Sequence, residues 1–203
     1  PLLTHARKLL FMPDLLGYLL TGVKGCEYTI ASTSQMLSPR TRTWDRGLLD
    51  KLGIQFWRTD HGWMKADTME DCHVIDACLN ATVCKNLFLC NAQRTAFYLL
   101  LLPGNKPFRT KDLSHQIGSA RLSFADAAHM EEYLDILPGA VSVMGLMNDT
   151  GGHVRLLIDR DVTEAPYIGC HPCVNTSSLR IRTPDLLGRF LPHVGHAPTF
   201  VTL

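Results

Sequence analysis

The longest nearly uninterrupted apolar stretch of this chain, Phe97 to Pro103, is followed at once by the turn signal Pro103-Gly104. It is far too short to cross a bilayer, which takes about 20 apolar residues. A second apolar stretch, Cys84 to Cys90, precedes it, and Asn91 to Arg94 separate the two. Because polar residues of this kind join paired strands, the pattern predicts a β-hairpin and not a membrane segment.

Strand and helix patterns alternate along the rest of the chain. We expect strands at 55–59, 84–90, 95–102, 122–124, 154–158, 175–182 and 199–203. We expect helices at 67–79 and 110–118, one that ends at 134 and one that opens at 183. Thr110 is the expected cap of the second helix, and Ser123 or Asp126 that of the third. The predicted fold class is α+β, with a mixed, largely antiparallel sheet and surrounding helices.

The N-terminal quarter of the chain has a different character. Pro13-Asp14 are typical of a helix start, and Thr21-Gly22 of a helix end. The polar stretch 32–43 is the best candidate for a linker, and 44–53 predicts an amphipathic helix. We expect two parts, a short segment at 1–45 that is not an independent domain and a domain at 46–203.

The charge balance limits the kind of nucleic acid contact. Twenty Lys and Arg stand against nineteen Asp and Glu, for a formal net charge of +1. Proteins that bind long nucleic acids by counterion release usually carry a strong positive surplus. Any RNA contact is therefore expected to be local and guided by shape.

The seven cysteines form an odd set without a recognisable export signal, because Arg7 and Lys8 interrupt the first apolar stretch. Reduced thiols in a cytoplasmic protein are the simplest interpretation. The pair Cys170-His171-Pro172-Cys173 leaves a redox or metal module open as an alternative. A structural zinc needs four ligands, and no second pair lies at a suitable spacing, so no metal or other cofactor is expected.

Signatures of serine hydrolases, P-loop kinases and zincins are absent from the sequence. Lys85 stands out because it places a charge at the end of an apolar strand. It either extends its ammonium group to water or anchors a phosphate or carbonyl group. His171, Asn148-Asp149 and Asn175-Thr176 lie in expected loops, where turn formation explains them as well as function does.

Eight short motifs in order resemble the freestanding prolyl-tRNA editing family, the YbaK-like aminoacyl-tRNA deacylases, and specifically the branch that acts on Ala-tRNA(Pro). They cover roughly residues 47 to 203 and are Cys84–Leu89, Phe97–Gly104, Arg121–Ala125, Pro138–Ser142, Gly145–Asp149, Gly169–Pro172, Asn175–Leu179 and Gly195-His196. The resemblance implies hydrolysis of the ester that joins an amino acid to the end of tRNA, without a cofactor. The implied partners are the acceptor end of mischarged tRNA(Pro) and prolyl-tRNA synthetase, with neither DNA nor a membrane involved.

The resemblance also implies roles for single residues. Lys85 would lie near the terminal phosphate or carbonyl, Asn86 would orient the substrate, Gly139 would begin the loop that receives the aminoacyl group, and His171 would wall the pocket. The implied substrate contacts are Ser142, Val143, Asn148, Asp149, Gly169 and Asn175. Family members carry a proline where this chain has Val143, so the selectivity of the pocket is open. A catalytically inactive module that binds the tRNA acceptor end or the synthetase is the alternative function.

The first 53 residues resemble a different family. The stretches Phe11–Gly22 and Glu27–Leu37 are similar to a segment of rhamnulokinase-type sugar kinases. No phosphate-binding or catalytic loop of a kinase accompanies them, so sugar phosphorylation is not expected.

Overall fold

The computed structural model describes residues 48–60, 76–81, 83–173 and 177–203. The chain divides into two units, residues 1–48 and 49–203, and both sheets belong to the second. The helix expected at 13–20 and the linker at 32–43 lie outside the described residues, as do large parts of the helices expected at 44–53 and 67–79. Within the described ranges, no helix is long and apolar enough to cross a membrane.

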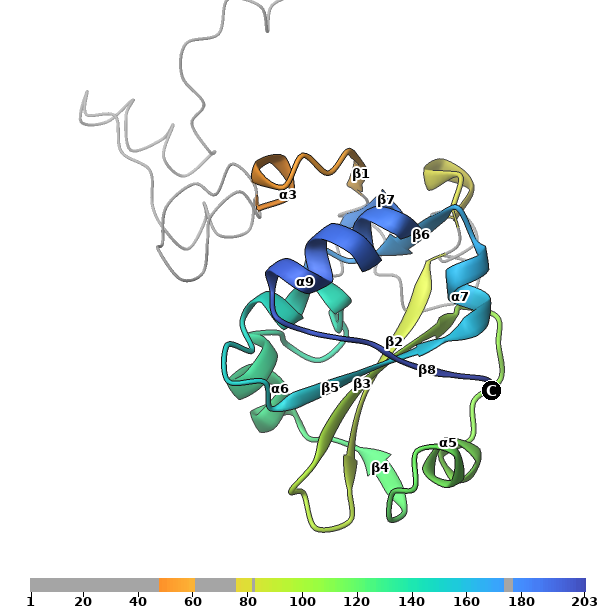
Figure 1. Cartoon of the computed structure of the whole chain (residues 1–203), viewed down its shortest axis with the longest axis vertical. Coiled ribbons are helices and arrows are strands. Elements are labelled where there is room, and N and C mark those ends of the chain that lie inside the picture. The colour runs from red at the N-terminus through yellow and green to blue at the C-terminus, as the bar shows by residue number, and fades with distance from the viewer. Residues whose placement is uncertain (1–47, 61–75, 82, 174–176) are drawn as a thin grey trace, which may run out of the picture. The chain divides into compact units, whose positions relative to one another are not determined.

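A five-stranded mixed sheet forms the centre of the unit (Figure 1). Its strands lie in the order β4-β2-β3-β5-β8. The bounds are β2 Cys84–Asn91, β3 Phe97–Pro103, β4 Leu122–Phe124, β5 Val154–Asp159 and β8 Thr199–Val201. β2 pairs with β3 and β4 antiparallel, whereas β3–β5 and β5–β8 are parallel pairs.

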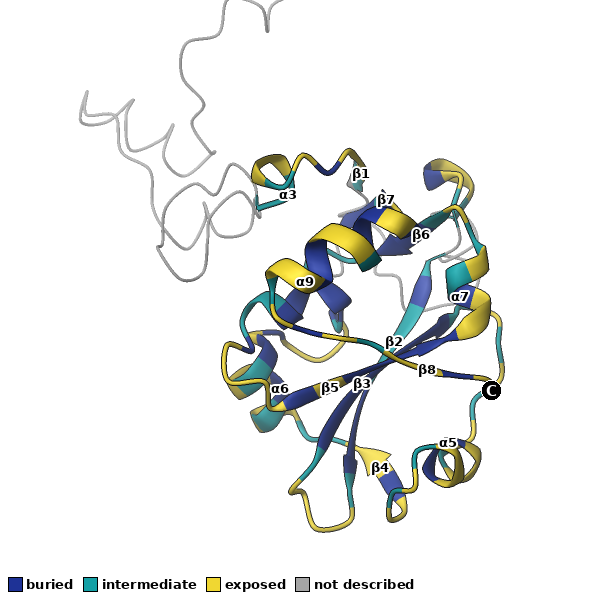
Figure 2. Ribbon diagram, in the orientation of Figure 1, coloured by how far each residue is buried: buried dark blue, intermediate teal, exposed yellow. Residues whose placement is uncertain are grey.

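The predicted hairpin is confirmed as β2 and β3, which pair from Cys84 opposite Pro103 to Cys90 opposite Phe97. Every residue from Phe97 to Leu102 is buried, because this strand lies between β2 and β5 and is covered on both faces (Figure 2). A strand buried on both faces has a continuous apolar sequence and not an alternating one. The central position of β3 in the sheet therefore explains why the stretch from Phe97 to Leu102 is continuously apolar.

A smaller antiparallel sheet, in the order β1-β7-β6, adjoins the first. Its strands are β1 Phe56–Asp60, β6 Tyr167–Cys170 and β7 Ser177–Arg182. A parallel bridge between Val83 and Gly169 links β6 to the residue that precedes β2. The two sheets therefore meet where the candidate residues of β2 begin.

Helices cover both faces of the larger sheet. Leu113 of α5, Thr110–Gln116, packs with Leu89 and Leu100 on one face. On the opposite face, His129 and Tyr133 of α6, Ala127–Leu134, lie against the ring of Phe97. The other helical elements are α3 Leu48–Lys51, the 3₁₀ turn η2 Val143–Met147, α7 Arg160–Glu164, and a continuous C-terminal helix made of α8 Thr183–Asp185, η3 Leu186–Phe190 and α9 Leu191–His193.

The α+β class with a mixed, largely antiparallel sheet is confirmed. So is the cap at Asp126, whose carboxylate accepts from the backbone N–H of His129, a bond that lowers the pKa of Asp126. The cap predicted at Thr110 is wrong, because Arg109 is the N-cap residue and makes no side-chain cap bond. Three elements were not predicted, β6, α7 and η2, because all three are short and lack a clear period.

Candidate active site

Lys85 lies on β2 and is half-buried. Its Nζ donates a hydrogen bond to the backbone carbonyl of Lys106, at 3.1 Å. Among the described residues, no carboxylate forms an ion pair with this ammonium group. A half-buried cation that only a carbonyl dipole compensates is well suited to receive an anionic oxygen.

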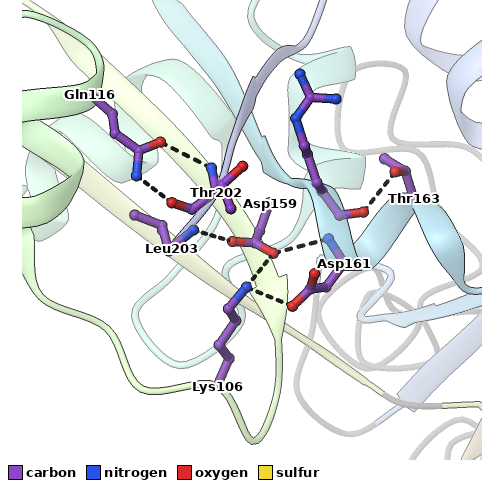
Figure 3. A network of polar contacts seen from close by, with 8 residues as sticks. Lys106, Gln116, Asp159, Asp161, Thr163, Thr202 and Leu203 are labelled. Carbon is purple, nitrogen blue, oxygen red and sulfur yellow. Dashed lines mark hydrogen bonds and ion pairs between the residues drawn. The ribbon is translucent and has the colours of Figure 1, made fainter.

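Lys106, whose carbonyl accepts from Lys85, has its own side chain in a polar network (Figure 3). Lys106 Nζ lies 2.8 Å from Asp159 Oδ1 and 2.6 Å from Asp161 Oδ2. The pKa of Lys106 is raised. Partial burial would lower this pKa, but the hydrogen bonds to the two carboxylates have the larger combined effect. Asp159, which is fully buried, also accepts from the backbone N–H of Leu203 at 2.9 Å. The loop before α5 is thus tied to β5 and to the C-terminal residues.

Asn86 faces the opposite side of the sheet from Lys85, since successive side chains of a strand alternate. Its Oδ1 accepts from the backbone N–H of Val143 at 3.1 Å, and its Nδ2 donates to the carbonyl of Cys84 at 2.9 Å. Asn86 therefore attaches the η2 turn to β2. Val143 is fully buried and its N–H donates to Asn86, so a direct contact of Val143 with substrate stays a prediction.

Ser142 and His171 are joined directly, although 29 residues separate them. Ser142 Oγ donates to the carbonyl of His171 and accepts from the backbone N–H of Met144 at 3.2 Å. His171 Nδ1 lies 2.9 Å from the carbonyl of Ser177, a group that only accepts, so Nδ1 carries the proton of this contact. Ser178 Oγ lies 3.3 Å from the same nitrogen.

Gly139 occupies an exposed turn shortly before Ser142 and has a φ of 90°. Residues with a side chain rarely adopt this conformation, so the turn requires glycine. Its role as the start of the loop that receives the aminoacyl group stays a prediction.

Asn148 and Asp149 are engaged in holding the loop between η2 and β5. Asn148 Nδ2 donates to the carbonyl of Leu134 at 2.7 Å. Asp149, which is buried, accepts from the backbone N–H of His153 at 2.9 Å and of Val154 at 2.7 Å. These contacts give both residues a structural task, whether or not they also contact substrate.

The structure thus connects Asn86, Ser142, Val143 and His171 through hydrogen bonds. Gly169 lies close to Lys85 along the sheet, because it bridges to Val83. Asn148 and Asp149 belong to a separate network, and Asn175 lies outside the described residues. The sequence did not single out Lys106, whose carboxylate partners are more than 50 residues away.

Comparison with known proteins decides the family. The aminoacyl-tRNA editing domain family matches residues 64–188. The chain belongs to this family. The prolyl-tRNA editing protein ProX of Acetoanaerobium sticklandii is 30% identical over 138 residues, which cover 68% of this chain and 83% of that protein. Prolyl-tRNA synthetase associated domain-containing protein 1 of Danio rerio is 32% identical over 126 residues, 61% of this chain and 67% of the relative.

A solved structure of a candidate trans-editing enzyme for prolyl tRNA synthetase shares the editing-domain fold. Its TM-score is 0.55 at 17% identity, over 82% of this chain and 99% of that one. The likeness confirms the fold class expected from the resemblance.

The kinase-like N-terminal segment is also confirmed. The N-terminal domain family of FGGY carbohydrate kinases matches residues 2–57. Rhamnulokinase of Pectobacterium carotovorum is 53% identical over 53 residues, which make up 26% of this chain and 11% of that kinase. The N-terminal segment is thus similar to about a tenth of the length of that kinase.

Three cysteines of the editing domain, Cys84, Cys170 and Cys173, are poor nucleophiles. Burial raises the pKa of the Cys84 thiol to about 12, and the carboxylate of Asp76 adds to the rise. Burial also raises the pKa of Cys170, and it raises that of Cys173 to about 12. Reactivity requires the thiolate, so these shifts disfavour the redox alternative for Cys170 and Cys173. Within the described ranges, no group of three or more side chains is placed to hold a metal ion.

We expect iodoacetamide at pH 8 to alkylate Cys84 and Cys170 of the folded protein at least about a hundredfold more slowly than the exposed Cys78. A raised pKa keeps both buried thiols protonated at this pH, and the core excludes the reagent. Mass spectrometry of timed digests measures the three rates. Rapid modification of Cys170 in a protein with an unchanged Tm would contradict this expectation and revive the redox interpretation.

Proposed function

We propose that this chain hydrolyses the aminoacyl ester of mischarged tRNA, with Ala-tRNA(Pro) as its substrate. Water attacks the ester carbonyl carbon, the bond from that carbon to the ribose oxygen breaks, and free amino acid and tRNA with an intact terminal hydroxyl result. Family membership supports the class of reaction. The name of the Acetoanaerobium sticklandii relative, a prolyl-tRNA editing protein, supports the tRNA.

The observation that carries the proposal is the setting of Lys85. Its ammonium group is half-buried and contacts a carbonyl oxygen instead of a carboxylate. An activated ester needs no side-chain triad for hydrolysis, so positioning and stabilisation of the developing oxyanion suffice. Lys85 would bind this oxyanion or the adjacent phosphate.

The pocket for the amino acid would lie between the Gly139 turn and His171. Ser142 links the two segments by donating to the carbonyl of His171, and Asn86 holds the turn that follows. This bracing would keep the pocket narrow, because neither segment moves without breaking a hydrogen bond. A narrow pocket accepts the methyl group of alanine more readily than the ring of proline.

The alternative function is an inactive module that binds the tRNA acceptor end or prolyl-tRNA synthetase. The name of the Danio rerio relative, which contains "prolyl-tRNA synthetase associated domain", gives this alternative its support. Deacylation assays with Ala-tRNA(Pro), Cys-tRNA(Pro) and Ala-tRNA(Ala) side by side separate the two functions. Turnover of none of them, with binding of tRNA or synthetase retained, would favour the inactive module.

We expect Ala-tRNA(Pro) to be hydrolysed at least a hundredfold faster than Pro-tRNA(Pro). Exclusion by size is needed to protect correctly charged tRNA, and a steric clash discriminates more strongly than one missing methylene, which is worth about 1–3 kcal/mol. The measurement compares kcat/KM for the two substrates with the same tRNA transcript. Comparable rates would show that the pocket does not select by size.

We expect a truncated chain that starts at Trp44 to retain full deacylase activity. All described candidate residues lie between Lys85 and His171, and the kinase-like segment supplies none of them. The measurement compares kcat/KM and the oligomeric state of the truncated and full chains. A tenfold loss of kcat/KM in a folded truncated chain, about 1.4 kcal/mol of transition-state stabilisation, would assign the segment a part in the site.

A further inference from the structure

The smaller sheet carries an aromatic and cationic cluster that the proposed hydrolysis does not use. The guanidinium carbon of Arg180 on β7 lies 4.1 Å from the ring centroid of Trp57 on β1 and 4.9 Å from that of Tyr167 on β6. The two rings meet edge to face, with centroids 5.7 Å apart. We call Trp57, Tyr167 and Arg180 the aromatic–arginine cluster.

The cluster is accessible and positively charged. Trp57 is 43% exposed, and Tyr167 and Arg180 are half-buried. Arg180 Nη1 donates to the carbonyl of Leu79 at 2.8 Å, and its Nε, which is buried, has no hydrogen-bond partner among the described residues. Both faces of a guanidinium group favour stacking against flat π systems.

The charge of this sheet face favours a polyanion. Paired residues of neighbouring strands share a face, so the pairs Trp57–Arg180, Thr59–Ser178 and Tyr167–Arg182 lie on one face. Arg182 is exposed. The described residues on this face of β1, β6 and β7 include two arginines and no carboxylate.

The cluster and Lys85 lie on the same face. Trp57 pairs with Arg180, Arg180 pairs with Gly169, and Gly169 bridges to Val83. Lys85 follows Val83 by two residues, the step that returns a strand to the same face. Three strand spacings separate Trp57 from Val83, about 14 Å in all. This length matches about four stacked nucleotides at 3.4 Å each.

We propose that the single-stranded 3′ end of the substrate RNA crosses this face, with one base stacked on Trp57 and its backbone phosphates at Arg180 and Arg182. The inference rests on the proposed function, since it leads the RNA end towards Lys85. It also explains how a chain with a net charge of +1 binds RNA without a broad basic surface. Stacking and two local cations supply the contact.

The test measures binding of two RNA hairpins by fluorescence anisotropy. One carries a four-nucleotide single-stranded 3′ end, and the other is the same hairpin with a blunt end. The chain should bind the first at least about tenfold more tightly, the effect of stacking one base. Trp57→Leu and Arg180→Lys should each remove most of this preference while leaving the blunt hairpin unaffected.

Phe200→Leu is the matched control. Phe200, on the edge strand β8, is 42% exposed, close to the value for Trp57, and its ring also contacts an arginine, Arg160 of α7. This substitution should leave binding unchanged. Circular dichroism melting confirms that the variants are folded, and Trp57→Leu keeps the test decisive if Arg180→Lys does not fold. Equal binding of the two hairpins by the parent chain overturns the proposal.

The other outcomes separate this inference from the proposed function. Variants that bind both hairpins normally but no longer bind purified prolyl-tRNA synthetase would overturn the proposal in favour of a protein surface. A parent chain that prefers the single-stranded end through Trp57 but hydrolyses no aminoacyl ester would support the RNA surface and contradict the proposed hydrolysis. Variants that still hydrolyse the aminoacyl ester and keep the parent's preference for the single-stranded end would support the proposed hydrolysis and overturn the RNA surface.

Discussion

Replacement of Lys85 by methionine is expected to lower kcat/KM for Ala-tRNA(Pro) at least about a hundredfold with little change in Tm. Methionine retains most of the apolar stem that lies along β2 and removes the ammonium group. The ammonium group has no carboxylate partner among the described residues, so its removal leaves none of their carboxylates buried without a counter-charge. Removal of one donor to a developing oxyanion typically costs about 10²–10³ in kcat. Single-turnover deacylation measures the effect.

Lys111→Met provides the control for Lys85→Met, because Lys111 is an exposed lysine on the nearby α5. It should deacylate at the parent rate. Lys85→Arg retains the charge but changes its shape and should recover only part of the activity. If Lys85→Met turns over like the parent chain, Lys85 is a strand-end lysine and the site assignment is wrong.

Replacement of Asp149 by alanine is expected to lower the free energy of unfolding by about 3–5 kcal/mol. The carboxylate is buried and accepts from two backbone N–H groups, those of His153 and Val154. Its Oδ2 also lies 3.6 Å from Nε2 of the buried His196. Alanine would leave these donors unsatisfied in the interior, where each costs about 1–3 kcal/mol. Urea denaturation followed by circular dichroism measures the loss.

Asp112→Ala is the matched control, since Asp112 is an exposed aspartate in the first turn of α5. Its effect should stay within about 0.5 kcal/mol. Asp149→Asn keeps one acceptor oxygen and should give an intermediate loss. An Asp149→Ala protein of parental stability with a raised KM would instead assign Asp149 the substrate contact that the resemblance implies.

Local patterns predicted much of the fold. The two apolar stretches and the turn between them predict the hairpin of β2 and β3. Ser123 and Asp126 are the two predicted caps of α6, and the structure selects Asp126, whose carboxylate reaches an N–H group of the first turn. The strand β6 was missed, since it is four residues long and three of them are buried regardless of which face they occupy. A strand without alternation and of this length has no period to detect.

The candidate site was predictable only as a set of residues, not as an arrangement. Lys85 stood out as a charge in an apolar strand, but its contact with Lys106 depends on a loop held by Asp159 and Asp161. The bond from Ser142 to His171 likewise joins segments that are distant in the chain. The aromatic–arginine cluster draws one residue from each of three strands, so no short motif contains it.

The sequence by itself determined where most of the described strands and helices form and made Lys85 a candidate residue, because apolar periodicity, turn residues and caps act over a few positions. It also determined that Lys85 and Asn86 face opposite ways, since strand side chains alternate. Only the tertiary structure decided what each of them meets: the Lys106 carbonyl on one face and the η2 turn on the other. Those neighbours come from segments about 20 and 57 residues away, and their placement depends on strand order and packing, which no local pattern encodes.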